Sequence, residues 1–478
     1  MSTYNPIIHI ALAGLLFSLA VDIVVRIRAP RDIPIVRGVL PFRSVLNGLA
    51  FFARRTSWLL ECRKRYGDFY MFSIGSQNIV IVSTKPMLKV LYGDGGKSLG
   101  SKELHFRILA ALGSRCNRDL LDVPVHDCFI PSIGHALSKS VIARDMAIPI
   151  HQGLLSRIQR LTPLDQTFPL SEIIGKTLYG PLTTAVFGPS FPLETYDDYL
   201  SLDAAIPTLM GPVPFTAWRG IQARNRLLKV LASYIQETDL VSDVISNAIE
   251  SGQSGSLPLH EQAVCLLGVL WALHANLQRT IFWVVAFILV DQSAFERLCT
   301  EVRQTIAEKY GGTVEGLVRS EGNILLSDFP LVDSAIKESM RMSGLSSSMR
   351  TVDFDTKFPV GTSSFVLRRG DLILGDTRAV HYDDDIYPNA STFKVDRFLG
   401  VDSKTLGIHT WGGGVNICRG RFLAKYAMKL WLIMLLETYD LASEISRVPK
   451  MDPRSWNSIA DPASDIMVSL HRRKAKGL

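Results

Sequence analysis

Trp411-Gly-Gly-Gly-Val-Asn-Ile-Cys-Arg-Gly-Arg421 decides the fold, because this stretch delivers one cysteine from a glycine-rich loop to the start of an apolar helical run. Glycines let a backbone approach a flat ligand in conformations closed to other residues. The helix that we expect from about Arg421 to Tyr439 directs the positive end of its dipole toward the sulfur of Cys418. Both effects favour a thiolate and predict a metal ligand. The alternative is a buried cysteine that acts as a small apolar side chain.

The remaining cysteines argue against metal sites built from several thiolates. They are scattered singly, without CxxC spacing, at Cys62, Cys116, Cys128, Cys265 and Cys299. Neither a zinc site nor an iron–sulfur framework fits this pattern. One protein thiolate on one metal leaves haem iron as the best candidate. The unpaired cysteines also indicate a reducing compartment.

Two segments upstream of the loop predict a buried ionic cluster. Lys337-Glu-Ser-Met-Arg341 places Glu338 and Arg341 three residues apart on one helical face. Phe393-Lys-Val-Asp-Arg-Phe398 contains Arg397, whose guanidinium is expected to bind the same carboxylate as a second arginine partner. Taken alone, the first segment also fits an exposed helical ion pair.

Together the three segments, in this order, resemble the cytochrome P450 family. The loop matches its haem-binding motif, with Trp411 in place of the usual Phe, and the other two match its ExxR helix and the arginine that follows it. The chain is most similar to fungal enzymes of secondary metabolism. The resemblance implies a mainly α fold with small β-sheets over residues 31–478, preceded by one transmembrane helix in an anchor and hinge at 1–30. No linker, repeat or charge block divides the longer part.

The resemblance also implies the cofactor and its contacts. Cys418 is the expected axial thiolate of haem b, in the loop that contains Gly412 and Gly414. The expected contacts of the haem propionates are Arg350, Asn416 and Lys139. Lys139 is expected four residues after His135 on one helix, with an ordinary solvated lysine as the alternative.

The amino-terminal segment predicts a membrane anchor. Ile7 to Val25 is mostly apolar and long enough for a bilayer core, and Arg26, Arg28 and Arg31 follow it. Because positive charge follows the segment, the catalytic part is expected in the cytosol, held by a single pass in the endoplasmic reticulum membrane. A cleaved signal peptide is the alternative, but its basic flank would precede the apolar segment.

Residues 260–291 predict a long buried helix. Gly268, Ala272, Ala275, Asn276 and Arg279 form one small or polar stripe along it. The stripe fits the oxygen-binding helix of the branch that contains sterol 7-alpha-hydroxylases and prostacyclin synthase, or else close helix packing. The resemblance places Ala275 and Asn276 where most relatives carry a catalytic acid and alcohol.

That departure leaves two reactions open. A monooxygenase needs protons to cleave dioxygen, and Asn276 offers only amide hydrogen bonds to an ordered water. A haem-thiolate isomerase that rearranges a substrate peroxide needs neither protons nor a reductase. For His274 we expect a satisfied buried imidazole rather than a proton relay. For Arg279 we expect a carboxylate or propionate partner, with an acidic substrate as the alternative.

The expected function is oxidation of a hydrophobic terpenoid, sterol-like or polyketide molecule with electrons from NADPH-cytochrome P450 reductase. The net charge of +7 is spread without an aromatic-interleaved patch, so no nucleic-acid partner is expected. The basic residues expected to face the reductase follow Cys418, at Arg419, Arg421, Lys425 and Lys429. Membrane lipid is the further expected partner.

Two coarser patterns complete the expected fold. Residues 68–84 alternate in polarity around Gly75-Ser-Gln-Asn78, which predicts a hairpin. Residues 102–255 predict several amphipathic helices with breaks at Pro131, Pro149 and Gly180-Pro181.

Overall fold

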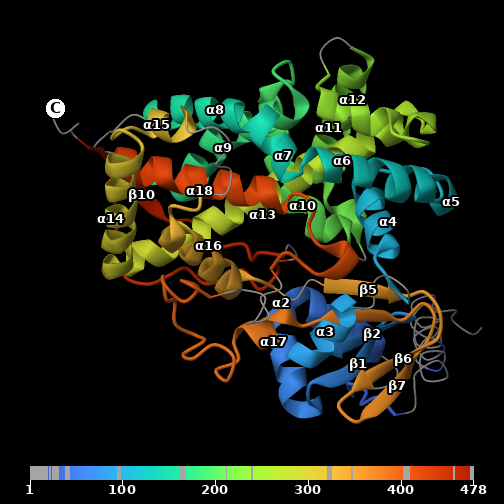
Figure 1. Ribbon diagram of the computed structural model, residues 1–478. Coiled ribbons are helices and arrows are strands. Elements are labelled where there is room, and N and C mark those ends of the chain that lie inside the picture. Colours follow the sequence, from blue (N-terminus) through green and yellow to red (C-terminus); the bar gives the residue numbers. More distant parts are fainter. Residues whose placement is uncertain are drawn as a thin grey trace, which may run out of the picture.

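The computed structural model describes residues 20, 23, 32–37, 43–93, 98–161, 167–211, 213–237, 241–319, 326–345, 348–401, 410–455 and 458–473. Across these residues most of the chain is helical, and the strands form small sheets (Figure 1). The predicted class, mainly α with small β-sheets, is confirmed. The expected anchor at residues 7–25 falls outside the described residues except for positions 20 and 23.

A five-stranded sheet forms one end of the molecule, with strand order β1-β2-β8-β5-β3. The strands are β1 Phe69–Ile74, β2 Gln77–Val82, β3 Leu99–Gly100, β5 Ser348–Val352 and β8 Leu372–Gly375. Strands β1 and β2 pair antiparallel, so the predicted hairpin is confirmed. Successive side chains of β1 point to opposite faces. Accordingly, helix α2 (Arg43–Tyr66) covers one face of the sheet and α3 (Lys85–Gly93) covers the other.

Two smaller sheets lie outside this one. The first pairs β6 (Thr356–Val360) with β7 (Ser363–Leu367). The second has the order β4-β10-β9 and joins β4 (Phe168–Pro169), β10 (Met467–Arg472) and β9 (Tyr439–Ala442).

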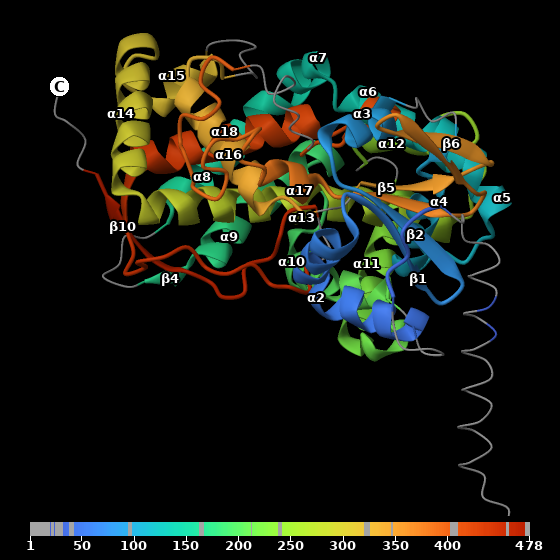
Figure 2. The same ribbon diagram turned by 90° about the horizontal axis from the view of Figure 1, so that it is seen from below.

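The helical part is built around α13 (Leu259–Val290) and α18 (Arg421–Thr438), which cross the centre of the molecule in both views (Figures 1 and 2). Both agree with their predicted ranges. α13 is the described helix that is long and apolar enough to cross a membrane, but 67% of its most apolar window is buried inside the protein. Helix α16 (Pro330–Ser343) packs against both. A helix that is apolar on all sides is buried in a core, and α13 fits that rule.

Shorter helices cover this centre. They are α4 Lys102–Ala111, α5 Arg118–Leu121, α6 Ile130–Ala136, α7 Lys139–Val141, α8 Ala147–Gln159, α9 Leu170–Phe187, α10 Tyr196–Leu209, α11 Trp218–Gln236, α12 Asp243–Glu250, α14 Gln292–Lys309, α15 Val314–Arg319 and α17 Thr377–His381. The predicted break at Gly180-Pro181 is wrong, because α9 continues through Pro181 to Phe187. A Cβ on Gly153 would lie 3.0 Å from Pro181, so α8 packs directly on the proline. This tertiary packing outweighs the helix-breaking tendency of proline.

Candidate functional site

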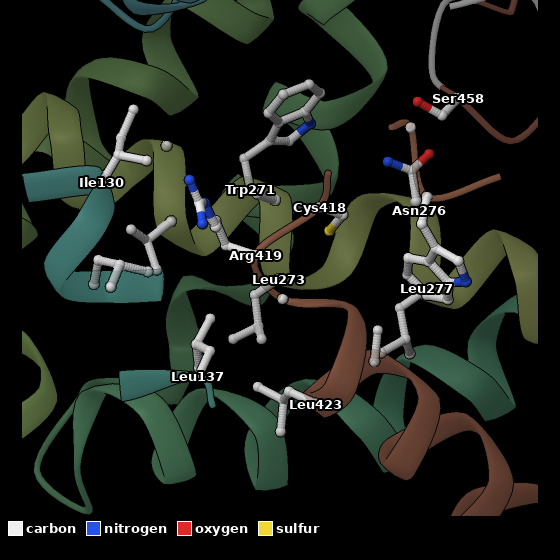
Figure 3. A pocket seen from close by; sticks show the side chains of 18 of the residues that line it. Ile130, Leu137, Trp271, Leu273, Asn276, Leu277, Cys418, Arg419, Leu423 and Ser458 are labelled. Carbon is white, nitrogen blue, oxygen red and sulfur yellow. The ribbon is translucent and has the colours of Figure 1, made fainter. Parts of the chain in front are cut away.

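A cavity of about 520 Å³ lies between α13 and the loop that leads into α18. Gly268, Ala272 and Asn276 of α13 line one side, and Gly412 and Cys418 line the other. In Figure 3 the sulfur of Cys418 points into this cavity, and Asn276 approaches it from α13. Part of the predicted stripe, Gly268, Ala272 and Asn276, therefore lines the cavity rather than serving only for close helix packing.

The glycines of the loop have different tasks. Gly412 and Gly414 have φ angles of +71° and +60°, in the left-handed region that favours glycine. Gly412 lines the cavity. Gly414 does not face it: a Cβ there would lie 2.1 Å from the carbonyl oxygen of Tyr92, so this glycine lets the loop pass against α3. The backbone N–H of Cys418 donates to the carbonyl of Trp411 at 2.9 Å, which closes the loop around the sulfur.

The surroundings of Cys418, which is exposed to the cavity, act on the pKa of its thiol in opposite directions. Burial raises the pKa of the thiol above its ordinary value, although the backbone N–H of Gly420 and the charge of Arg421 lower it. The helix start thus lowers the pKa of the thiol as expected, but it does not offset the effect of desolvation. A metal cation bound at the sulfur would favour the deprotonated form.

The predicted ionic cluster forms behind the cavity. Glu338 and Arg341 of α16 are 0% exposed and share two hydrogen bonds, of 2.7 and 2.8 Å. Arg397 donates from Nε to Glu338 Oε1 at 2.8 Å. The remaining N–H groups of Arg397 donate to backbone carbonyls of residues 388–392. The cluster thus binds α16 to the segment that leads toward the Cys418 loop.

Arg350 of β5 marks one edge of the cavity. It is 6% exposed, and its Nη1 donates to the carbonyl of Met349 at 2.8 Å. Within the described part of the chain no carboxylate pairs with it, and burial lowers its pKa. His105 of α4 lines the same cavity, and burial, His126 and Arg350 lower its pKa to about 4. These groups form an edge suited to a negatively charged ligand group.

His105 and His126 were missed by the sequence analysis. His126 Nε2 lies 3.1 Å from His105 Nδ1, and His126 Nδ1 lies 3.1 Å from Asp122 Oδ1. The two imidazoles are separated by 21 positions. No local pattern relates two single histidines at that distance, so only the fold brings them together.

Two other expected propionate contacts have different surroundings. Asn416 lines the cavity, and its Oδ1 accepts from Ser101 Oγ at 2.6 Å. The structure does not bring Lys139 to the cavity, because its Nζ lies 4.9 Å from the ring centroid of Phe422. His135 and Lys139 also lie on separate helices, α6 and α7, rather than on one.

The amide of Asn276 has a defined orientation. Its Oδ1 accepts the backbone N–H of Ile459 at 3.1 Å. Figure 3 shows its nitrogen on the side that faces Cys418. Ala275, one residue earlier, is 1% exposed and does not line the cavity. Asn276 therefore presents N–H donors to the cavity, whereas Ala275 presents nothing.

His274 is a buried imidazole, as predicted, but among the described residues only Nε2 has a hydrogen-bond partner and Nδ1 has none, so the ring is not fully satisfied. Its Nε2 lies 2.9 Å from Thr183 Oγ1, and its ring packs in a tilted orientation on Tyr179 and edge-on against Tyr199. Burial lowers its pKa to about 3. It does not line the cavity, so it is not placed to relay protons there.

This burial predicts a pH dependence of stability. Between about pH 6.5 and pH 3 the unfolded state binds a proton at His274 that the folded state does not, so acid lowers the free energy of unfolding by up to about 1.4 kcal/mol per pH unit. His274→Phe keeps the ring and is expected to flatten the acid side of the profile. Urea denaturation at pH 7.5, 6.5, 5.5 and 4.5 measures this. The exposed His471→Phe serves as control; parallel profiles for wild type and His274→Phe would contradict the prediction.

The basic residues after Cys418 are dispersed. Lys429 is 7% exposed and pairs with Asp333 at 2.9 Å, so its expected place at a reductase-facing surface is wrong. Arg419 lines the cavity instead. Arg421 and Lys425 are half-buried and lie over the rings of Phe422 and Trp411.

The observed residues fit haem. Haem would lie in the part of the cavity between the loop and α13, and Cys418 would be a ligand of its iron. Its carboxylates would pair with Arg350 and His105, which carry no carboxylate partner among the described residues. The buried arginine then gains the charge partner that a low-dielectric site requires.

Comparison with known proteins gives a consistent result. The model of the family described as Cytochrome P450 matches residues 221–470, more than half of the chain. The chain is 30% identical to Cytochrome P450 7A1 of Sus scrofa over 57% of this chain and 58% of that protein. It is 23% identical to 7-alpha-hydroxycholest-4-en-3-one 12-alpha-hydroxylase of Homo sapiens over 98% of each chain. It is 26% identical to Cytochrome P450 7B1 of Mus musculus over 90% of each chain.

A solved structure supports the same fold. The structure of retinoic acid bound cyanobacterial CYP120A1 superposes with a TM-score of 0.73 at 17% identity. The alignment covers 93% of this chain and 100% of the other.

Proposed function

The chain belongs to the cytochrome P450 family and is a monooxygenase of that family, and we propose that it oxidises a hydrophobic small molecule of sterol-like or terpenoid type. The observation that carries this proposal is the set of apolar side chains with which α4 and α13 line the cavity, among them Ile108, Leu109, Val269 and Leu273. Haem would take up the part of the 520 Å³ that lies beside the loop. Such walls favour a substrate with few polar groups. A polyketide intermediate of secondary metabolism is the other substrate class that these walls would accept.

The side chains around the cavity have distinct tasks in the proposed reaction. Haem held by Cys418 supplies the redox chemistry, to which the thiolate contributes electron density. Asn276 holds a water or a substrate oxygen through its N–H donors. Leu273 and Leu277 help to exclude bulk water. Thr280 also lines the cavity, but its hydroxyl already donates to the carbonyl of Asn276 at 2.8 Å.

The proposal includes an electron donor and a membrane. An NADPH-dependent flavoprotein reductase would approach near Arg421 and Lys425, on the side of the loop away from α13. Residues 1–30 would anchor the catalytic part, 31–478, to the endoplasmic reticulum membrane. Phe215 and Trp218, which are 73% and 64% exposed, support a lipid contact. They lie just before and at the start of α11, which shares the lower face of Figure 2 with α2.

One observation favours the isomerase as a second candidate. No carboxylate is found among the described residues that line the cavity, so its wall provides no carboxylic acid for the cleavage of dioxygen. A rearrangement of a substrate peroxide would need no such donor.

Turnover measurements separate the two candidates. The full-length protein in lipid vesicles with a P450 reductase and NADPH is expected to oxidise one of cholesterol, 7-alpha-hydroxycholest-4-en-3-one or a terpenoid panel. One dioxygen and one NADPH should be consumed per product if coupling is complete. The reaction without NADPH is the control. Without NADPH or dioxygen, conversion of a substrate peroxide into an isomer that keeps both peroxide oxygens would establish the isomerase and contradict the proposed oxidation. Transfer of one peroxide oxygen to a second molecule would not count as isomerisation.

A further inference from the structure

Arg279 stands behind the cavity wall, where it joins three segments that are distant in the sequence. It lies on α13 with a side chain that is 12% exposed, and it does not line the cavity. Its Nη2 donates to Asp203 of α10 at 2.7 Å, and its Nε donates to Asp461 at 2.5 Å. One guanidinium therefore connects α10, α13 and the C-terminal segment 458–461. The planar fork of arginine suits it to two separate carboxylates.

The contact with Asp203 fixes one wall of the cavity. Asp203 is 9% exposed, and its Oδ1 accepts from Trp271 Nε1 at 2.8 Å. Trp271 lines the cavity (Figure 3). The orientation of this large ring thus depends on a carboxylate whose other oxygen is held by Arg279.

The contact with Asp461 fixes the opposite wall. Ser458 and Ile459 line the cavity, and the backbone N–H of Ile459 donates to Asn276. The backbone N–H of Asp461 donates to Ser455 Oγ at 2.8 Å. The segment that carries Ser458 is therefore attached to α13 by side chains at three points, Asn276, Arg279 and Trp283, whose Nε1 donates to the carbonyl of Ala460 at 2.7 Å.

A third contact lies on α13 itself. Arg279 Nη1 donates to the carbonyl of Ala275 at 2.5 Å, next to Asn276. Burial alone would lower the pKa of Arg279, but Asp203 and Asp461 raise it above its ordinary value. The arginine remains charged, each of its three nitrogens already has a partner, and its side chain does not line the cavity. An acidic substrate is therefore not its partner.

We propose that Arg279 is a positioning residue that determines substrate fit by holding Trp271 and residues 458–459 at a fixed separation on either side of Asn276. The inference rests on the proposed function, because it takes the cavity as the substrate site. Removing the guanidinium would leave Asp203 buried without its cation. The 458–461 segment would stay attached through Asn276 and Trp283, but α10 would lose its ionic link to it. The separation of the two walls against which a bulky ligand packs would then no longer be fixed.

Binding of two azoles to the holoenzyme tests the inference. Imidazole is too small to reach these walls, whereas clotrimazole carries three phenyl rings. Calorimetry is expected to show that Arg279→Gln weakens clotrimazole binding by about tenfold while imidazole binding stays within about twofold. Asp461→Asn removes the charge from one of the two carboxylates that pair with Arg279. It is expected to weaken clotrimazole binding in the same way, but by a smaller factor. It serves as the second variant if Arg279→Gln does not fold.

Arg303→Gln is the matched control. Arg303 ties α14 to Asp440 at 2.6 Å, far from the cavity lining, and its loss should leave the ratio of the two azole affinities unchanged. The inference is overturned if Arg279→Gln and Asp461→Asn both leave the ratio of clotrimazole to imidazole affinity unchanged. It is also overturned if Arg303→Gln changes this ratio to the same extent. Failure of the proposed function would appear elsewhere, as a wild-type protein without a carbon monoxide difference spectrum of the thiolate type.

Discussion

Replacing Cys418 with serine is expected to abolish the thiolate-type Soret shift of the reduced, carbon monoxide-bound protein. The sulfur of Cys418 points into the cavity between the loop and α13. A serine hydroxyl at this place stays protonated, so it provides neither the negative charge nor the electron donation of a thiolate. Product formation with NADPH and reductase should fall to the background rate. The difference spectrum and the turnover assay measure the two effects separately.

Cys265→Ser provides the matched control. Cys265 is 4% exposed on α13 and lines the same cavity from the opposite side. The same atom exchange there should leave the spectrum intact, because a serine on a helix satisfies its hydroxyl at the preceding turn. A thiolate-type shift that survives in Cys418→Ser would refute Cys418 as the ligand, and so would a shift that disappears only in Cys265→Ser.

The second large effect is expected from Glu338→Gln. The carboxylate accepts from Arg341, Arg397 and the backbone N–H of Lys394. A glutamine offers one carbonyl oxygen and places an N–H₂ group against an arginine, which leaves buried positive charge without a partner. Breaking a buried ion pair from one side costs about 3–5 kcal/mol. Since proteins are stabilised by only about 5–15 kcal/mol, much of the folding free energy would be lost.

Thermal denaturation and haem content measure this effect. The melting temperature is expected to fall by roughly 3–5 °C, because the unfolding entropy of a chain of this length is about 1 kcal/mol per K. A smaller fraction of the purified protein should carry haem, because the cluster holds the segment before the Cys418 loop. Glu172→Gln makes the same exchange in the exposed pair with Lys176 and should cost about 0.5 kcal/mol or less. Equal losses in the two variants would contradict the assigned importance of the buried cluster.

Much of the fold could be predicted because its signals are local. The hairpin of β1 and β2 follows from an alternation of polarity around Gly75. The length of α13 follows from an uninterrupted apolar run, and the start of α18 follows from the glycines before Arg421. Pro181 is one exception, because packing of α8 against α9 outweighed a local preference, and the division between α6 and α7, which separates His135 from Lys139, is another.

The candidate site was predictable only where its members share a motif. Glu338 and Arg341 lie on one helical turn, so their spacing alone indicates that they meet. Lys139 has no such neighbour, and the structure places it against Phe422 rather than at the cavity. The place of His105 at the cavity could not be predicted, because it depends on how α4 packs against the residues before α6.

By itself the sequence determined the single cysteine in its glycine loop, the ionic cluster that supports it and the long apolar helix opposite. Each of these depends on residues within one turn, one loop or one ordered series of motifs. Only the tertiary structure decided the partners of Arg279, the donor side of the Asn276 amide and the raised pKa of Cys418. Burial and ion pairing arise between segments as far apart as Asp203 and Asp461, and no local pattern encodes those distances.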